Sequence, residues 1–326
     1  MLHTARRKIV LDGQTEPSVA VRRVQFDAYM LETLCSRGVE VLPARLTNLE
    51  FHADRVVVYT ESLPLEANVV VGAFGLDEGT GVIFARTVSY RPPPALSSVV
   101  TKYHPGEEAM LAFDNRIHAF LPAEPRIEFG AITPKGNHLT INIAGKSVDA
   151  ALMYRFLAMP KVRNTLPALE NACRFDPNDM RYFKGRFPYG LARNFSGDRF
   201  VMVGDAAGLV RAFKGKGVTS AIQSGVRAAQ CILQQGISAA AFGTYHTANR
   251  DITSDLPYGR AVRRFTILAA RFGLIEVLLR AAESGPGLRR ALFDAVSAHQ
   301  PYRRVLREGM TPASVGAVLA ALLHRS

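Results

Sequence analysis

The stretch that decides the fold reads VMVGDAAG over residues 201–208 and KGKGVTSAI over residues 214–222. Its first residues, Val201–Val203, form an apolar run that is typical of a buried strand. A turn of small residues around Asp205 follows, and then come a glycine-rich loop and a helical pattern. Ligands of open α/β sheets lie beyond the carboxyl ends of the strands, which is where Asp205 falls. This order of elements therefore predicts a small-molecule site.

The residue types in this stretch suit a flat ligand that carries hydroxyl groups and develops negative charge. The carboxylate of Asp205 can accept hydrogen bonds from hydroxyls. Gly215 and Gly217 have no Cβ atom where a ring would approach the backbone. The helix that begins near Val218 offers free N–H groups and the positive end of its dipole.

Length and composition exclude several classes of protein. The 326 residues suffice for one large domain or two ordinary ones. With 48% hydrophobic and 21% charged residues, the chain is not disordered, collagen-like or a coiled coil. No apolar run reaches the roughly 20 residues of a membrane span, and no secretory signal is recognised. The three cysteines, Cys35, Cys173 and Cys231, are widely separated and support neither a disulfide framework nor a zinc site. We therefore expect the protein to reside in a reducing cytoplasm.

Two regions are expected before the deciding stretch. The first begins with an amphipathic helix over Gln25–Arg37, with Cys35 on its apolar face. Short strands follow at Val39–Leu42, Leu46–His52, Arg55–Thr60 and Ala67–Val71, the last of them buried on both faces. The second region, about Ser97–Ile143, holds several β-type runs and predicts an antiparallel sheet.

From residue 148 onward the pattern is mainly helical. Pro160 and Pro167 should break the first helical stretch into short pieces. The helix after Gly217 has an apolar stripe that should pack under another layer. The stripe consists of Val218, Ala221, Ile222, Gly225, Ala229, Ile232 and Leu233, and Cys231 of the same helix is interpreted as a packing residue.

The string GDAAG…GKGVTSAIQSGVRAA resembles the C-terminal flavin-binding motif of FAD-dependent oxidoreductases related to geranylgeranyl reductases and to aromatic-ring flavin monooxygenases. Arg23–Asp27 resembles the R-x-x-F-D segment of the reductase branch, and Val70–Gly75 resembles its V-V-G-A-D-G turn. The resemblance covers essentially the whole chain. It implies an α/β fold of the p-hydroxybenzoate hydroxylase type, with a partial Rossmann-like FAD-binding domain (residues 1–95 and 148–235), an antiparallel substrate lobe (96–147) and a helical C-terminal region (236–326).

The resemblance also implies roles for matched residues. Asp205 would bond the ribityl chain of FAD, and the N–H groups of Gly217 and Val218 would meet the pyrimidine edge of the flavin. Arg23 would contact the phosphate and sugar region, and Leu46 matches a position whose backbone meets the adenine. The expected cofactor-binding set is Arg23, Leu46, Ala73, Gly75, Asp205, Gly215, Gly217 and Val218; no catalytic residue is assigned.

The sequence departs from the family pattern at three places. The G-x-G-x-x-G turn that would hold the pyrophosphate is missing, so the chain looks truncated at its N-terminus. Gly79–Phe84 is no substitute, because it lacks a third glycine and opens no expected helix. Phe74 replaces the Asp of the A-D-G turn, and Ala212 and Lys216 replace a Pro and a Glu of the glycine loop. The aromatic signature of the prenyl reductases is not kept near Glu128–Pro134.

These features leave three functions open. The first is reduction of a carbon–carbon double bond of an isoprenoid or other apolar substrate by hydride transfer from FAD, with NAD(P)H or a ferredoxin as electron donor. The second is flavin monooxygenation, which uses the same motifs. The third is a flavin-free remnant, because a chain without the pyrophosphate turn should bind FAD poorly. His104, His118 and His138 lack metal-ligand spacing and are interpreted as ordinary histidines.

The net charge of +12 favours acidic partners. Arginines gather late, at Arg260–Arg264, Arg289–Arg290 and Arg303–Arg307, and no nucleic-acid-binding motif accompanies them. Arg260–Arg280 is compatible with an interfacial amphipathic helix and equally with a core helix whose arginines are solvated. An anionic membrane surface is therefore favoured over nucleic acid as partner, and we expect a cytoplasmic protein at the inner face of the membrane.

Overall fold

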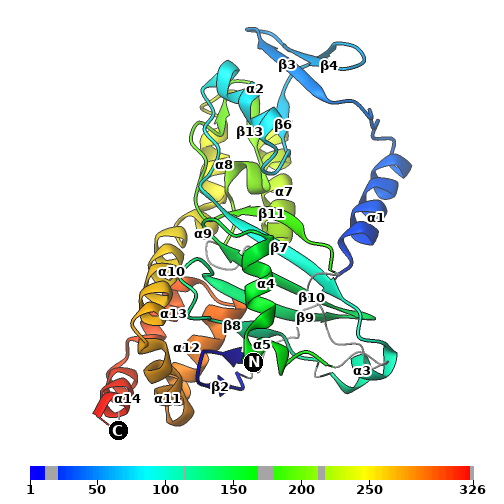
Figure 1. Ribbon diagram of the computed structural model, residues 1–326. Coiled ribbons are helices and arrows are strands. Elements are labelled where there is room, and N and C mark those ends of the chain that lie inside the picture. The colour runs from blue at the N-terminus through cyan, green and yellow to red at the C-terminus, as the bar shows by residue number, and fades with distance from the viewer. Residues whose placement is uncertain (12–20, 114, 168–179, 212–216, 324–326) are drawn as a thin grey trace.

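The structure is a computed structural model that describes residues 1–11, 21–113, 115–167, 180–211 and 217–323. Within these residues, three sheets are combined with helices that gather toward the C-terminus (Figure 1). The mixed α/β class, the antiparallel lobe and the helical C-terminal region that the sequence predicts are confirmed.

The largest layer is a seven-stranded sheet in the order β11-β7-β10-β9-β8-β1-β2. Its described pairs are antiparallel except β1 with β8. The expected antiparallel region supplies its centre, and β1, β2 and β11 join from outside residues 96–147. The strands are β1 (Leu2–His3), β2 (Lys8–Ile9), β7 (Ala95–Tyr103), β8 (His118–Phe120), β9 (Phe129–Lys135), β10 (His138–Gly145) and β11 (Phe183–Pro188).

One face of this sheet is covered by α4 (Ala150–Ala158) and α5 (Pro160–Arg163), and the predicted break at Pro160 is confirmed. Phe156 of α4 is fully buried and packs on Gly130 of β9, where a Cβ atom would overlap its ring. The strands contribute every second residue to this core, as the alternation of a pleated strand requires. These residues include Val99, Tyr103, Ile132, Leu139, Ile141 and Ile143.

A second lobe contains two three-stranded sheets, in the orders β12-β13-β6 and β3-β4-β5. Their strands are β3 (Leu46–Phe51), β4 (Val56–Thr60), β5 (Leu65–Ala67), β6 (Val70–Gly72), β12 (Ser196–Gly197) and β13 (Phe200–Met202). The expected hairpin and the buried strand before Asp205 are confirmed. The strand expected at Val39–Leu42 is absent from this described segment. The run Ala67–Val71 divides between β5 and β6, and Val71 is exposed, so burial on both faces was wrong.

Two helices of this lobe correct the sequence interpretation. The predicted helix α1 (Arg23–Ser36) is present, but none of its residues is buried and Cys35 is exposed, so Cys35 does not serve packing. Figure 1 shows α1 at the margin of the molecule. Gly79–Phe84, where no helix was expected, opens α2 (Glu78–Val88). The carboxylate of Asp77 starts that helix by accepting the N–H of Thr80 at 2.7 Å.

Helix α7 (Gly217–Gln235) is confirmed, but its buried face is not the expected one. Ile222 is 47% exposed and Leu233 is 85% exposed. The buried side chains are the small residues Ser220, Ser224, Ala228 and Cys231, which confirms Cys231 as a packing residue. The face with small side chains is the buried one because α7 lies directly against the short helix α6 (Gly204–Ala207). Ser224 Oγ accepts the N–H of Gly204 at 2.9 Å.

The remaining helices are α3 (Glu107–Ala112), α8 (Phe242–Ala248), α9 (Arg250–Thr253), α10 (Leu256–Arg271), α11 (Leu274–Ser284), α12 (Pro286–Ser297), α13 (Tyr302–Gly309) and α14 (Pro312–Leu323). The stretch Arg260–Arg280 is divided between α10 and α11. Arg263 faces the sheet, where its Nε donates to Glu128 at 2.6 Å and both side chains are buried. This arginine is therefore an anchor of the C-terminal helices. In the described part of the chain, no helix is long and apolar enough to cross a membrane.

Candidate ligand-binding site

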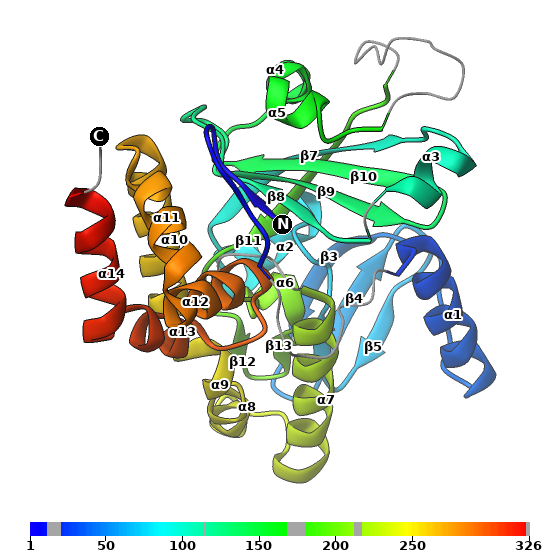
Figure 2. The same ribbon diagram turned by 90° about the horizontal axis from the view of Figure 1, so that it is seen from below.

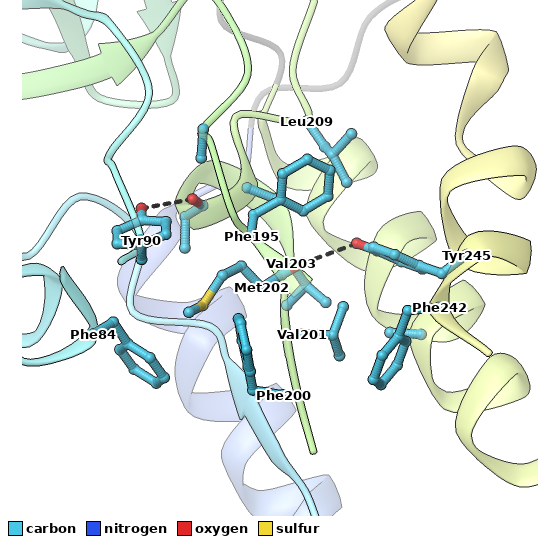
Figure 3. Packing of buried hydrophobic residues seen from close by; sticks show 14 of the residues in the cluster. Phe84, Tyr90, Phe195, Phe200, Val201, Met202, Val203, Leu209, Phe242 and Tyr245 are labelled. Atoms are coloured by element: carbon cyan, nitrogen blue, oxygen red, sulfur yellow. Dashed lines mark hydrogen bonds between the residues drawn. The ribbon is translucent and has the colours of Figure 1, made fainter. Parts of the chain in front are cut away.

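The turn that carries Asp205 is held from both sides by buried tyrosines (Figure 3). The hydroxyl of Tyr90 donates to the Ala206 carbonyl at 2.7 Å, and the hydroxyl of Tyr245 donates to the Met202 carbonyl at 3.0 Å. Burial raises the pKa of Tyr90 to about 12, so its hydroxyl remains a donor at neutral pH. The backbone before and after Asp205 is thereby fixed in one position.

The turn also depends on a glycine at its end. Gly208 adopts a φ of +72°, in the left-handed region, and a Cβ atom there would overlap the carbonyl oxygen of Gly190. Any other residue would displace the chain that follows Asp205. The small-residue turn of the sequence is thus required by its backbone geometry.

Asp205 presents a buried carboxylate oxygen that has no hydrogen-bond partner among the described residues. This atom, Oδ1, would lie 3.0 Å from a Cβ atom at Gly217, the first residue of α7. Burial raises the pKa of Asp205, and the nearby charge of Arg23 opposes that rise. A buried acceptor without a partner costs free energy, and native proteins retain such groups where a ligand supplies the donor.

The start of α7 completes the geometry next to this carboxylate. Gly217 and Val218 are its first residues, so their N–H groups have no partner within the helix. The arrangement offers an acceptor for a ligand hydroxyl and, directly beside it, donors and a positive dipole end for a ligand edge that carries negative charge. Ala73 and Gly75 follow β6, which runs parallel to β13 with Gly72 opposite Met202, so both turns lie at the same edge of the sheet.

Two other expected residues lie further from Asp205. Arg23 begins α1, where it is exposed and forms an ion pair with Asp27 at 2.6 Å, yet its charge acts on Asp205. Leu46 begins β3 in the other small sheet, half-buried against the core of the lobe. Gly215 lies outside the described residues. The structure therefore brings together Asp205, Gly217 and Val218 and places the turn after β6 at the same sheet edge.

Sequence reasoning missed the residues that support the site from behind. Tyr90 and Tyr245 hold the turn, and no motif marks them. Ser224 also holds the turn; it lies within the string GKGVTSAIQSGVRAA, but no role was assigned to it. Phe74, which replaces the Asp of the family turn, stacks on Phe84 with ring centroids 5.4 Å apart and meets Tyr90 edge-on. An apolar contact beneath the turn thus stands where the family pattern has a carboxylate.

A cavity of about 320 Å³ lies beside the first turns of α7, between them and the C-terminal helices. Three of its charged side chains are engaged in structural contacts. Asp251 pairs with Arg227 at 2.8 Å, Asp255 accepts the N–H groups of Tyr302 and Arg303, and Arg211 donates to the Ala298 carbonyl. The lining is Val210, Arg211, Thr219, Ser220, Gln223, Asp251, Ile252, Asp255, Leu256, Ala298, His299 and Pro301. An unpartnered buried carboxylate oxygen beside the N-terminus of a long helix is found at Asp205, and none of the residues that line this cavity has one, so the turn at Asp205 is the stronger candidate among the described residues.

No protein-family model and no curated protein matches the sequence. Solved structures do match the fold. A flavoprotein/dehydrogenase from Cytophaga hutchinsonii is 16% identical with a TM-score of 0.65, and the match covers 95% of this chain and 76% of that one. A geranylgeranyl bacteriochlorophyll reductase-like protein from Thermoplasma acidophilum is 15% identical with a TM-score of 0.59 (93% and 72% covered). A flavin-dependent brominase is 18% identical with a TM-score of 0.61 (88% and 75% covered). The chain therefore has the fold of FAD-dependent flavoproteins.

Proposed function

We propose that the protein is an FAD-dependent oxidoreductase that reduces a carbon–carbon double bond of a substrate with a large apolar part. The observation that carries the proposal is the unpartnered Asp205 Oδ1 beside Gly217, on a turn that two buried tyrosines hold. Similarity of fold to a reductase-like protein and to other flavoproteins supports it.

The described residues fit the ribityl and ring portions of FAD. Asp205 would accept a hydrogen bond from a ribityl hydroxyl, and the N-terminus of α7 would stabilise negative charge at the pyrimidine edge. FAD, when bound, supplies hydride chemistry. The large sheet, which lies across from α6 and α7 in Figure 2, would hold the substrate.

The described residues offer fewer groups that could bind the pyrophosphate of FAD. Helix α2 follows β6, but its N-terminus is capped by the carboxylate of Asp77, which repels phosphate. We therefore expect FAD to bind the 326-residue chain only about as well as riboflavin, which shares the ring and ribityl group. Titration of both ligands, followed by quenching of flavin fluorescence, measures the ratio of their dissociation constants. A large preference for FAD would show that other residues hold its pyrophosphate.

The role of Asp205 is tested with Asp205→Ala, with riboflavin as the ligand. Loss of a charge-assisted hydrogen bond of about 1.5–3 kcal/mol should weaken binding roughly ten- to a hundredfold. Asp198→Ala is the matched control, because this carboxylate of the β12–β13 hairpin already accepts the N–H of Ala239 at 2.7 Å. Unchanged flavin affinity in a folded Asp205→Ala protein would reduce the turn to a packing element.

Monooxygenation is the rival reaction, because it would use the same cofactor contacts. Product analysis with and without oxygen separates the two reactions. Reduction continues under anaerobic conditions with a supplied electron donor, NAD(P)H or reduced ferredoxin. A product that contains an oxygen atom from O₂ would reject the reductase assignment.

We also propose that the C-terminal helices bring the enzyme to an anionic membrane surface on the cytoplasmic side. Phe265 and Leu268 of α10 and Phe272 directly after it are exposed apolar residues, next to the exposed Arg264 and Arg271. Helix α14 has no charged residue, and its Val315, Leu319 and Leu323 are exposed at a spacing of four. Arginines near anionic head groups contribute about 1 kcal/mol each. Co-sedimentation with anionic but not neutral liposomes, lost at high salt, is the expected result; equal recovery in the supernatant would reject the proposal.

A further inference from the structure

Among the described residues, one face of the large sheet is only partly covered. The C-terminal helices pack over the end of this face that carries Ala119, Phe129 and Ala144. At the opposite end, near the β9–β10 turn, Lys102 is exposed and Thr140 is half-buried. Figure 2 shows α4 and α5 on one side of the sheet and α6 and α7 on the other. The uncovered part therefore belongs to the face that is turned toward the side of α6 and α7.

Basic side chains gather on this part of the sheet. His138 of β10 is paired with Lys135 of β9, and Thr140 is paired with Lys102 of β7. Directly opposed residues of antiparallel strands share a face, and so do residues two apart in one strand. Leu139 and Ile141 point to the α4 side, so Lys102, Lys135 and His138 share the uncovered face. We call these three residues the basic face.

Two further basic side chains lie near His138. The ring of His104 lies 5.2 Å from that of His138, and Arg22 donates to the Asn137 amide oxygen, 3.2 Å from His138 Nδ1. His138 is only 8% exposed. Burial lowers its pKa, and the charges of His104, Lys102, Arg22 and Lys135 lower it further. Lys102, Lys135 and Arg22 are cationic at neutral pH, so positive charge gathers around the basic face.

Such a cluster binds anions. Positive groups that are held together in a partly buried place repel one another, and an anion relieves that repulsion while it accepts their hydrogen bonds. The next residue of β7 on the same face is Val100, which lies between Asn142 of β10 and Phe183 of β11, and Phe183 is 55% exposed. Arg22 also adjoins Arg23, the first residue of α1, whose charge acts on Asp205 of the proposed flavin site.

We propose that the basic face binds the anionic group, a carboxylate or a phosphate, of the substrate, whose apolar part lies toward Val100 and Phe183. This inference rests on the proposed function, because only an enzyme of that kind would make the bound anion part of a substrate. The same chemistry could be supplied by the pyrophosphate of FAD itself. The substrate class is thereby narrowed from an apolar molecule to an amphiphile with one acidic end.

The test uses inorganic pyrophosphate as the probe and the flavin-free 326-residue chain. Isothermal titration at low ionic strength should detect binding that is at least about tenfold weaker in the double variant Lys102→Gln/Lys135→Gln. The matched control is Lys184→Gln. Lys184 is an exposed lysine of β11 opposite Val99, so it lies on the other face of the same sheet. It should change the dissociation constant by less than about twofold. Circular dichroism melting checks that the variants fold.

Two results would overturn the proposal, and the first of them does not depend on flavin binding. Equal pyrophosphate affinity in the double variant and the wild type would show that the cluster is not an anion site. Competition by saturating FAD, but not by riboflavin, would assign the basic face to the cofactor's own pyrophosphate. Pyrophosphate binding that needs both lysines and survives saturating FAD supports a substrate site. A failure of the proposed function would appear separately, in the riboflavin titration that compares Asp205→Ala with the wild type. In that case the wild type itself would not bind riboflavin.

Discussion

The α4 side of the large sheet and the outer surface of α7 both carry regularly spaced apolar residues, two apart on the strands and four apart on the helix, but bury them very differently. On the sheet, the alternating residues of β10 and the facing residues of α4 are fully buried. On α7, the apolar residues Ile222 and Val226 point outward, and the helix is held by Ser224 and Ala228. The difference shows that periodicity identifies a helix and its faces, whereas the closeness of the neighbouring backbone decides which face is buried.

The largest expected effect tests this contrast directly. Phe156→Ala removes a ring that fills the space over Gly130 and should lower the free energy of unfolding by about 3–5 kcal/mol. Ile222→Ala, on the outer surface of α7, should cost about 0.5 kcal/mol or less. Chemical denaturation of both variants measures the two values. A similar loss in both would mean that the outer surface of α7 is covered in solution, for example by a second copy of the chain.

A smaller effect tests the buried face of α7. Ser224→Ala removes the acceptor of the Gly204 N–H and leaves that buried donor unsatisfied, at a cost of about 1–3 kcal/mol. Gln230→Ala changes an exposed residue of the same helix and should stay within about 0.5 kcal/mol of the wild type. Because Gly204 precedes Asp205, riboflavin affinity should fall in Ser224→Ala but not in Gln230→Ala. Unaltered stability of Ser224→Ala would show that this hydrogen bond does not hold the turn.

Much of the fold could be predicted from the sequence because its signals are local. The strand, turn and helix around Asp205, the hairpin of β3 and β4 and the break at Pro160 all follow from neighbouring residues. Apart from the unexpected helix α2 and the strand expected at Val39–Leu42, the errors concern long-range packing. Arg263 reads as one of a surface cluster, and only its approach to Glu128, 135 positions away, makes it a buried anchor. Tyr90 and Tyr245 hold the turn through single hydroxyls, and nothing near them in the sequence marks that role.

The smallest expected effect separates folding from ligand binding at Asp205. Burial raises the pKa of this carboxyl in the folded, flavin-free protein above its unfolded value. The folded state therefore holds the proton more tightly, and stability is lost as pH rises through the folded pKa. Asp205→Asn cannot ionise, so its melting temperature should exceed that of the wild type by a few degrees at neutral pH. The difference should vanish at a pH below the unfolded pKa, where both side chains are neutral.

The same substitution should have the opposite effect once ligand is present. With saturating riboflavin at neutral pH, the wild type gains stability from the hydrogen bond to its carboxylate, and Asp205→Asn gains less. The difference between the two melting temperatures is then expected to become smaller or to change sign. A melting temperature of Asp205→Asn that is lower than that of the wild type without flavin would show that the Asp205 carboxylate is satisfied within the folded chain. Asp205 Oδ1 would then no longer be evidence for a ligand site, and the flavin-binding site would lie elsewhere.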